Sequence, residues 1–398
     1  MNPKRIIGFL LRELVVQPLR YLSLGLLYLI IPVFRVKLFL VGQTSIGATV
    51  GCLELYLRRC QLGTLSLPKG YYAAVVGRAI NEQLIEMYGR QLPVIRSGFL
   101  YWLVNSRPLR GSPFVERLPW EQDEYPELNS GHPVLSFTES EEREGRALLS
   151  RMGIPKDAWF VCFHARDDGY WLQYQPETNY STRTSFRNCT IENFIDAMKY
   201  IVSCGGYTVR VGAGVEQPLP DLGDPHIVDY ASNHQTDFGD IYLLAKCKFL
   251  VGNNSGLYLI SSVFNVPTAV TNTVPISQVP LRHDDLFIPK IIWWPTEKRV
   301  LTFPEILSSD IGDYWLNEKY VNAGLEPLQN SKEEILAVTK EMNQRLDGTF
   351  SGTEQDEQLQ ENFQVLLRPG HRAYGSPARL ASTYLRAHQE LFEPVPSL

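Results

Sequence analysis

The 398-residue sequence lacks the short motifs that identify several common enzyme classes. It contains no GxxxxGK[ST] loop, no GxSxG turn and no HExxH pair, which excludes the usual signatures of P-loop nucleotide hydrolases, α/β-hydrolases and zinc proteases. It also contains no internal repeat and no low-complexity block. Its chemistry therefore has to be inferred from less specific patterns.

Paired cysteines and an excess of positive charge are also absent. The six cysteines form no CxxC pair and show no metal-ligand spacing, so we expect free thiols in a reducing, cytoplasmic compartment. The formal net charge of −5 offers no basic field, so we expect no nucleic-acid partner. Asp284-Asp285 is a weak metal candidate, and nothing else in the sequence requires a metal or a cofactor.

The one strongly hydrophobic region lies near the N-terminus. Its most apolar stretch, residues 21–34, has 14 residues, whereas a spanning helix needs about 20. No small-residue cleavage site follows, so we expect no signal peptide. Basic residues flank and interrupt the stretch, which predicts that residues 1–34 form a helical segment on the surface of an anionic bilayer. The alternative is a helical pair that packs on the protein itself or mediates a dimer.

Strands and helices alternate along most of the remaining chain. Short β-branched and aromatic runs recur between amphipathic helical patterns, and this alternation predicts an α/β fold with doubly wound parallel sheets. Strands are expected at 35–41, 71–76, 159–164, 207–211, 227–230, 248–251 and 267–272. Less regular patterns predict an irregular segment or linker at 107–137, a mobile linker at 354–360 and an amphipathic helix at 376–392.

In such sheets ligands bind outside the carboxyl ends of the strands. The loops after residues 163, 211, 229, 251 and 271 are therefore expected to share one rim. The most informative of them is Asn253-Asn254-Ser255-Gly256, which joins an apolar strand to the start of a helix. Unpaired backbone N–H groups and the helix dipole suit this place to an anion, most often a phosphate. The alternative is an ordinary turn with capping residues.

A second candidate loop is His164-Ala165-Arg166-Asp167-Asp168. The planar guanidinium of Arg166 can bind a phosphate through two hydrogen bonds, which suits a diphosphate. A nearby carboxylate would hold this arginine or act on a substrate. The alternative is a surface loop with a local Arg–Asp pair.

Arg183 and Arg187 precede the helical pattern at 190–204 and again suggest anion binding at a helix start. A solvated loop with capping residues would explain them equally well.

Two further groups of residues follow predicted strands on the same rim. Gly212 and Gly214, after Arg210, would allow a ligand to approach the backbone. Asp229 and Tyr230 could meet a base or a ribose, and the alternative for this pair is a structural role.

Five motifs together carry a resemblance to a known family: His-x-Arg-Asp, Tyr-Ser-x-Arg-x-Ser-x-Arg-Asn-x-x-Ile-Glu-Asn-Phe, Gly-Tyr-x-Val-Arg-Val-Gly, Phe-Leu-Val-Gly-Asn-Asn-Ser-Gly-Leu and Asn-Val-Pro. Through them the chain resembles a bacterial family of glycosyltransferases found in surface-polysaccharide gene clusters. The resemblance covers roughly residues 36–300 and is strongest from 159 to 282. More distantly, His164-x-Arg166 and the Ser-Gly loop are similar to the donor half of fucosyltransferase-like GT-B enzymes.

The resemblance implies a GT-B fold, in which two Rossmann-like domains face a cleft, and metal-independent transfer. On this chain it implies an acceptor domain at 35–150, a donor domain at 151–310 and a C-terminal helical extension at 311–398, after the membrane-associating segment at 1–34.

The resemblance also implies a set of site residues. Contacts to the donor phosphates would come from Arg166, Arg183, Arg187, Asn254, Ser255 and Gly256. The nucleoside pocket would be lined by Arg210, Gly212, Gly214, Asp229, Tyr230 and Asn253.

The first βα loop departs from the family pattern. It contains Gln43, Thr44, Ser45 and Gly47, which would face the acceptor, but it lacks the acidic or histidine residue expected there. The general base is therefore expected at Asp167 or Asp168 first, and at His164 second.

Together with these residue patterns, the resemblance implies an enzyme that would transfer a hexosyl or pentosyl unit from a nucleotide sugar to a glycan or lipid-linked glycan of lipopolysaccharide or capsule. Arginines and a helix N-terminus would stabilise the leaving diphosphate in place of a metal. The enzyme would lie at the inner face of the cell membrane. A nucleotide-sugar epimerase of the same architecture and a non-catalytic membrane-anchored scaffold are the alternatives, and several cations around one rim argue against the scaffold.

Overall fold

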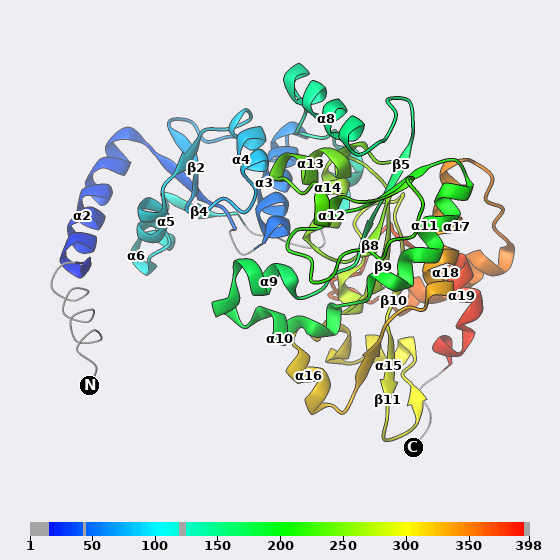
Figure 1. Cartoon of the computed structure of the whole chain (residues 1–398). Coiled ribbons are helices and arrows are strands. Elements are labelled where there is room, and N and C mark those ends of the chain that lie inside the picture. Colours follow the sequence, from blue (N-terminus) through cyan, green and yellow to red (C-terminus); the bar gives the residue numbers. More distant parts are fainter. Residues whose placement is uncertain (1–15, 43–44, 119–124, 394–398) are drawn as a thin grey trace, which may run out of the picture. The chain divides into compact units, whose positions relative to one another are not determined.

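The computed structural model describes residues 16–42, 45–118 and 125–393. The chain divides into two compact units, Met1–Trp120 and Glu121–Leu398. Each unit is built on a parallel sheet with helices on both faces (Figure 1), as the alternating pattern predicts.

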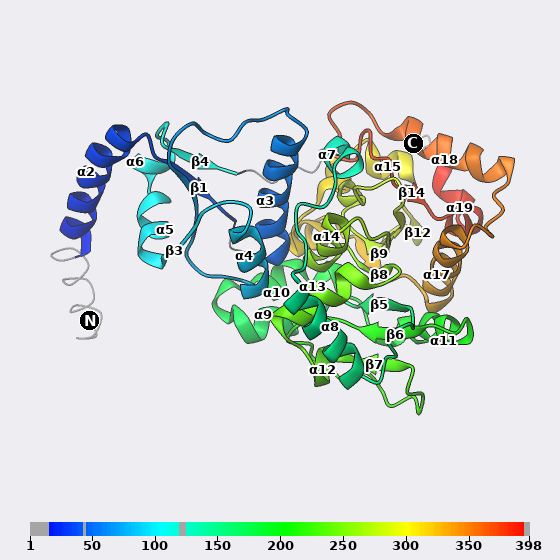
Figure 2. The same ribbon diagram turned by 90° about the horizontal axis from the view of Figure 1, so that it is seen from above.

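The first unit contains a four-stranded parallel sheet in the order β3-β2-β1-β4. Its strands are β1 (Lys37–Leu40), β2 (Tyr72–Val76), β3 (Val94–Arg96) and β4 (Val115–Arg117). Figure 2 shows helices α3 (Ile46–Gln61) and α4 (Glu82–Gly89) on one face, and α2 (Gln17–Phe34), α5 (Gly98–Val104) and α6 (Arg107–Arg110) on the other.

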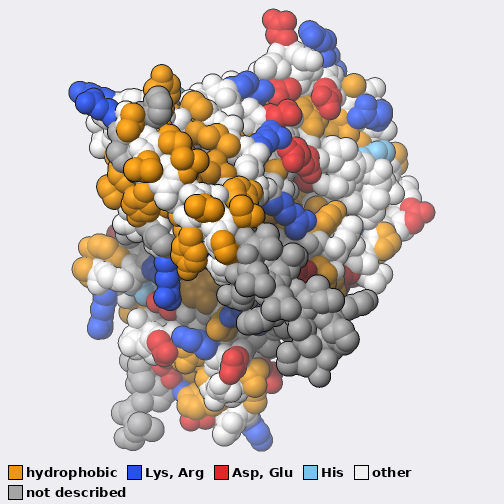
Figure 3. Space-filling model, turned by 90° about the vertical axis from the view of Figure 1, so that its left-hand side faces the viewer, with side chains coloured by type: hydrophobic (Ala, Val, Ile, Leu, Met, Phe, Trp, Pro, Cys, Tyr) orange, Lys and Arg blue, Asp and Glu red, His pale blue; other side chains and the backbone are white. Residues whose placement is uncertain are grey.

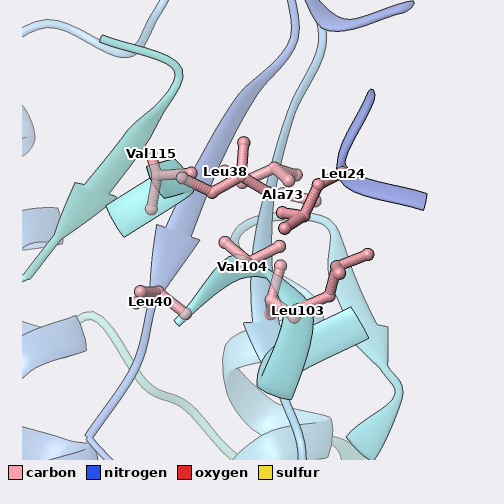
Figure 4. Packing of buried hydrophobic residues seen from close by; sticks show 9 residues of the cluster. Leu24, Leu38, Leu40, Ala73, Leu103, Val104 and Val115 are labelled. Carbon is pink, nitrogen blue, oxygen red and sulfur yellow. The ribbon is translucent and has the colours of Figure 1, made fainter. Parts of the chain in front are cut away.

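Helix α2 is attached to this sheet by one side. Its Leu24 is buried among Leu38 of β1, Ala73 of β2, and Leu103 and Val104 of α5 (Figure 4). Apolar contacts of this kind supply most of the stability of a short packed helix. The opposite side of α2 takes no part in this core.

The second unit contains a seven-stranded sheet in the order β14-β10-β9-β8-β5-β6-β7, and every pairing in it is parallel. Its strands are β5 (Phe160–His164), β6 (Tyr207–Arg210), β7 (Ile227–Asp229), β8 (Leu250–Asn253), β9 (Thr268–Thr273), β10 (Leu286–Pro289) and β14 (Arg379–Leu380). The common direction confirms that the loops after β5, β6, β7, β8 and β9 share one rim.

Two helical layers cover this sheet (Figure 2). One layer contains α8 (Glu139–Arg151), α12 (Tyr230–Asn233), α13 (Asp237–Lys246) and α14 (Gly256–Val263). The other contains α11 (Ile195–Ser203), α17 (Lys332–Leu346), α18 (Glu354–Leu366) and α19 (Ser382–Ala387). A small antiparallel sheet, β12-β11-β13, is formed by Arg299–Val300, Ile291–Trp294 and Glu326–Leu328.

The strand order reverses beside β5. On one side of β5 lies β6, followed by β7. The next strand along the chain, β8, pairs with the other side of β5. His164 and Gly252 are partners at this junction, and a Cβ on Gly252 would lie 2.7 Å from the carbonyl oxygen of His164. Glycine therefore permits the close approach of β5 and β8, at the kind of switch point where doubly wound sheets bind ligands.

Three of the expectations about secondary structure are wrong. The segment 107–137 contains α6, the edge strand β4 and α7 (Tyr125–Ser130). The expected linker at 354–360 is the start of α18, because Thr353 and Asp356 form a capping box. The expected helix at 376–392 is replaced by β14, α19 and a final 3-10 turn (Gln389–Phe392), because Leu380 pairs with Phe287 of β10.

The boundaries of the units also differ from the expected domains. Helix α8 packs on α13, and its Gly145 lies against the ring of Tyr242, so α8 belongs to the second unit although the first domain was expected to extend to residue 150. Helix α17 packs on α11 and on strands β9 and β10. The expected C-terminal extension therefore supplies three of the four helices of one layer of the second unit, α17, α18 and α19, together with strands β13 and β14.

Of the predicted membrane-associating segment, residues 1–15 lie outside the described residues. Within the described part of the chain, no helix combines the length and the apolar character needed to cross a bilayer.

Candidate anion-binding site

Asn253 ties three segments together at the switch point. Its Oδ1 accepts hydrogen bonds from the backbone N–H of Arg166 at 3.0 Å and from Sγ of Cys189 at 2.9 Å. Its Nδ2 donates to the carbonyl of Arg187 at 3.0 Å. Asn253 is fully buried, so we infer that it positions the arginine-bearing loops around the strand ends.

Arg166 is buried and held in place by neutral groups. Its guanidinium donates to the carbonyl of Thr184 at 3.2 Å, to Oγ1 of Thr184 at 2.8 Å and to Oδ1 of Asn188. Burial, and then the positive charge of Arg187, lower the pKa of Arg166 to about 10, so it remains charged at neutral pH. The alternative of a surface Arg–Asp pair is therefore wrong for this arginine.

Arg187 and Asn254 contain polar atoms that the described residues leave unsatisfied. Arg187 donates from Nη2 to the carbonyl of Asn254, but its buried Nε has no hydrogen-bond partner among them. Burial lowers the pKa of Arg187. Asn254 donates from Nδ2 to the carbonyl of Val274 at 3.1 Å, and its Oδ1 is buried without a partner there. Such atoms in a folded protein indicate a bound water, ion or ligand.

Lys290 is a third cation that the sequence analysis missed. It directly follows β10, and its buried Nζ donates to the carbonyls of Phe186 at 2.9 Å and Asn188 at 2.7 Å. Burial lowers its pKa to about 8, with a further contribution from Arg166. No strand was expected at residues 286–289, so no sequence signal placed this lysine on the predicted rim.

These three cations have no ion-pair partner among the described residues. Buried charges are normally paired, because removing them from water is costly. The N-terminus of α14 adds its dipole, and its cap Ser255 accepts a hydrogen bond from the N–H of Leu257 at 3.4 Å. Gly256 is the first residue of this helix. The arrangement provides uncompensated positive charge for an anion.

The two carboxylates after β5 have different surroundings. Asp167 accepts from the N–H of Gly169 at 3.1 Å and of Glu216 at 3.0 Å, so it links two loops. Asp168 has a buried Oδ1 without a hydrogen-bond partner in residues 16–42, 45–118 and 125–393. Asp168 is therefore the carboxylate that is available to accept a proton.

His164 is buried at the end of β5. Its Nδ1 lies 3.1 Å from the carbonyl of Val211, which can only accept, so we assign the proton to Nδ1. Burial lowers its pKa to about 4, and the imidazole is neutral at neutral pH.

The residues expected around the nucleoside are largely engaged with the protein. Arg210 lies 3.5 Å from Asp229 and donates to the carbonyl of Gln217 at 2.7 Å. The hydroxyl of Tyr230 accepts a hydrogen bond from the N–H of Thr236 at 2.9 Å, and its one hydrogen can go to Asp240 at 3.0 Å or to the carbonyl of Thr236 at 2.9 Å, so it holds the turn before α13. A role of these side chains in nucleoside binding stays a prediction.

The glycines after β6 accommodate the protein itself. Gly212 and Gly214 have φ values of +148° and +64°. A Cβ on Gly214 would lie 2.8 Å from Oε1 of Gln173 on α9 (Gly169–Tyr174). Positive φ and close packing of α9 both require glycine here.

The remaining predicted residues are an exposed arginine of the second unit, two residues of the first unit and two residues outside the described part. Arg183 is exposed, in the last turn of α10 (Tyr180–Thr184). In the first unit Ser45 caps α3 and accepts from the N–H of Ala48 at 3.3 Å, while Gly47 is buried within α3. Gln43 and Thr44 lie outside the described residues.

No group of three His, Cys, Asp or Glu side chains suited to a metal ion occurs within the described part of the chain. Neither a protein-family model nor a curated protein matches this chain.

Solved structures resemble the chain in fold. A glycosyl transferase family 9 protein from Veillonella parvula superposes with a TM-score of 0.50 at 10% identity, over 77% of this chain and 96% of the other. Escherichia coli ADP-heptose lipopolysaccharide heptosyltransferase II gives a TM-score of 0.42 at 12% identity, over 63% and 90%. E. coli heptosyltransferase WaaC with ADP gives 0.35 at 13% identity, over 64% and 91%. The chain is thus a mixed α/β protein with two parallel sheets, consistent with the GT-B-like fold of glycosyltransferases.

Proposed function

We propose that the protein is a glycosyltransferase that uses a nucleotide-sugar donor. The observation that carries this proposal is the group formed by Arg166, Arg187 and Lys290, which lies at the switch point of a parallel sheet without an acidic partner in the described residues. A diphosphate matches both the charge and the unsatisfied donor on Arg187. The fold shared with a family 9 glycosyltransferase supports the same class of reaction.

In the proposed reaction an acceptor hydroxyl attacks the anomeric carbon of the donor sugar. The bond from that carbon to the diphosphate oxygen breaks, and a bond to the acceptor oxygen forms. Arg166, Arg187 and the N-terminus of α14 stabilise the negative charge that develops on the leaving nucleoside diphosphate. These fixed charges supply the stabilisation that a metal ion provides elsewhere, so we propose metal-independent transfer of a hexosyl or pentosyl unit.

Asp168 is the proposed general base. It would take the proton of the acceptor hydroxyl through its unsatisfied Oδ1. Asp167 would keep the loop after β5 in position through its two backbone partners. The proposed acceptor is a glycan or lipid-linked glycan of a bacterial surface polysaccharide, and the proposed place is the inner face of the cell membrane, reached through peripheral contact of residues 1–34.

Nucleotide binding is the first test. We expect one of UDP, GDP, ADP or CMP to raise the melting temperature, and the increase to persist in EDTA, because a ligand that binds only the folded state stabilises it by mass action. Nucleotide sugars that carry a hexosyl, pentosyl or heptosyl unit on that nucleotide are then compared as competitors for the same site. Acceptor-dependent release of the nucleotide would identify transfer, whereas a new sugar nucleotide formed without acceptor would identify an epimerase.

The variant Arg166→Ala tests the proposed role of this arginine in nucleotide binding. Arg143→Ala, on the exposed surface of α8, is its control. We expect Arg166→Ala to weaken nucleotide binding roughly 10- to 100-fold, the effect of one or two charge-assisted hydrogen bonds. The melting temperature of each ligand-free variant checks the fold. Unchanged affinity in a folded Arg166→Ala protein, or no nucleotide response in the wild type, would overturn the proposed donor site and favour the scaffold.

A further inference from the structure

Helix α2 has apolar side chains around most of its circumference. Of its 18 residues, only Arg20 is charged. Leu22, Leu29 and Val33 are 72, 72 and 75% exposed. A helix with apolar residues on all sides normally lies in a protein core or in lipid, yet α2 is attached to the first unit by one side alone.

The exposed apolar surface continues onto α5, which follows β3 in the chain. Phe99 and Trp102 are 57 and 39% exposed, and their ring centroids lie 5.9 Å apart. With Val16 and Leu19 they line an open groove of about 390 Å³ between the two helices. Figure 3 shows hydrophobic side chains gathered on the side of the molecule where α2 lies.

We call this surface the α2–α5 face and define it by Leu22, Leu29 and Val33 of α2 with Phe99 and Trp102 of α5. Contiguous apolar patches of this kind on soluble proteins mark sites of contact with a protein or a membrane.

The charged residues of helices α2, α5 and α6 are all of one sign. Helices α2, α5 and α6 contain no Asp or Glu, whereas the whole chain has a net charge of −5. Arg107 and Arg110 of α6 are exposed, and no ion pair involves them within the described residues. The guanidinium of Arg20 lies 4.8 Å from the ring centroid of Trp102, so its stem runs along the apolar surface. Apolar and aromatic side chains beside unpaired arginines complement an anionic phospholipid surface.

We propose that the α2–α5 face docks on an anionic lipid bilayer, with α2 and α5 lying in the plane of the interface. Leu22, Leu29 and Phe99 insert between acyl chains, while Arg107 and Arg110 meet the headgroup phosphates. The inference extends the membrane contact proposed for residues 1–34 to α5 and α6, and it does not depend on sugar transfer.

A second copy of the chain is the competing occupant. A two-fold dimer through this face would bury the same apolar surface, but it would bring two sets of arginines together with no acidic residue from α2, α5 or α6 to pair with them. Charge complementarity therefore favours lipid.

Vesicle sedimentation of the full chain tests the proposal. We expect strong binding to vesicles in which roughly one-third of the phosphatidylcholine is replaced by phosphatidylglycerol, and weak binding to phosphatidylcholine alone. The pairs Leu22→Glu/Leu29→Glu and Phe99→Glu/Trp102→Ser should each weaken binding at least roughly tenfold. Arg107→Gln/Arg110→Gln should weaken it by about tenfold, on anionic vesicles only.

Val365→Glu is the matched control, because Val365 is 80% exposed on α18 of the second unit, and this variant should bind as the wild type. The melting temperature and circular dichroism of every ligand-free variant check the fold, and the further increase in melting temperature with nucleotide shows whether the donor site is intact. A failure of lipid binding is therefore distinct from a failure of the transferase proposal.

Three results would overturn the inference. Unchanged binding of the Phe99→Glu/Trp102→Ser variant would remove α5 from the docking surface. Equal binding of the wild type to neutral and anionic vesicles would remove the role of the arginines. A dimer in the absence of vesicles that the same α2 and α5 variants dissociate would assign the face to a second copy.

Discussion

At the scale of single residues, the site is defined by charges that the described part of the protein does not neutralise. Arg166 is satisfied by neutral oxygen atoms, and Arg187 keeps one buried N–H without a partner there. A structural arginine in a core would normally meet a carboxylate. The protein thus maintains positive charge at the strand ends at a cost in folding free energy, which the proposed bound anion would offset.

The different surroundings of the two aspartates lead to a prediction about catalysis. Asp168→Asn should lower kcat by roughly 10²- to 10⁴-fold, because it removes the proposed base, and should leave nucleotide affinity within about a factor of three. Asp167→Asn should instead lower the free energy of unfolding by about 1–2 kcal/mol, because Asp167 bonds two backbone N–H groups. Initial rates and urea unfolding of both variants decide between the roles, and equal losses of kcat would contradict them.

Protonation of His164 should oppose folding. Its pKa is about 4 in the folded protein, below the ordinary histidine value of 6.5, so the unfolded chain binds the proton first as the pH falls. The contribution of His164 to stability is complete above about pH 6.5 and is lost as the pH falls toward 4. The wild type should therefore lose about 2 kcal/mol through this residue between about pH 7 and about pH 5.

The measurement is urea unfolding of the wild type and His164→Gln at both pH values. Buried Asp240 and Asp285 act in the opposite direction, because burial raises their pKa values to about 7 and about 6. Their contribution is present at low pH and is lost as the pH rises, so only the difference between the two proteins isolates His164. Parallel pH profiles of the two proteins would show that its proton has no such effect.

At the scale of elements, the sequence predicts those strands that are long, apolar and followed by glycine or asparagine. Strands β5, β6 and β8 are expected in this way, and their parallel pairing brings the predicted loops to one rim. Short edge strands such as β4 and β14 leave no periodic pattern, because two or three residues are too few to alternate. Tertiary pairing alone makes them strands.

The composition of the site could be predicted only in part. The loop at 253–256 and Arg166 carry local signals of anion binding, and the structure places them at the switch point. Lys290 and Asn188 could not be assigned, because their roles depend on partners far away in the sequence. The predicted contact through Arg183 rests on its place before a helical pattern and on the resemblance, and neither determines on which side of a short helix the residue lies.

Helix α18 gives a prediction at the element scale. Thr353 accepts from the N–H of Asp356 at 3.2 Å, and Asp356 accepts from the N–H of Thr353 at 2.8 Å. Thr353→Ala should lower the free energy of unfolding by about 1 kcal/mol, because it leaves helix N–H groups without a cap. Urea unfolding measures the change, and Thr182→Ala in the exposed part of α10 is a control. No difference between these variants would mean that the cap contributes nothing.

At the scale of the whole molecule, the proposed donor site lies entirely within the second unit. Saturating nucleotide should therefore slow amide hydrogen exchange in residues 165–189 and 250–263, and leave the strands of the first unit unchanged in the absence of acceptor. Hydrogen exchange with mass spectrometry measures both regions in one experiment. Slower exchange confined to residues 37–117 would assign the nucleotide to the first unit and would contradict the prediction.

The strand order of the second unit also determines when it can fold during synthesis. Strand β14 pairs with β10, and the buried residues Tyr384, Leu385 and Leu391 follow it in the chain. At roughly 5–20 residues per second, a ribosome needs on the order of 10–50 seconds to proceed from residue 117 to residue 380. During that interval the first unit, with its apolar helix α2, emerges from the ribosome while the larger sheet still lacks an edge. Under both proposals the nascent chain acquires its lipid-docking surface before its donor site, and a membrane could capture it while translation continues.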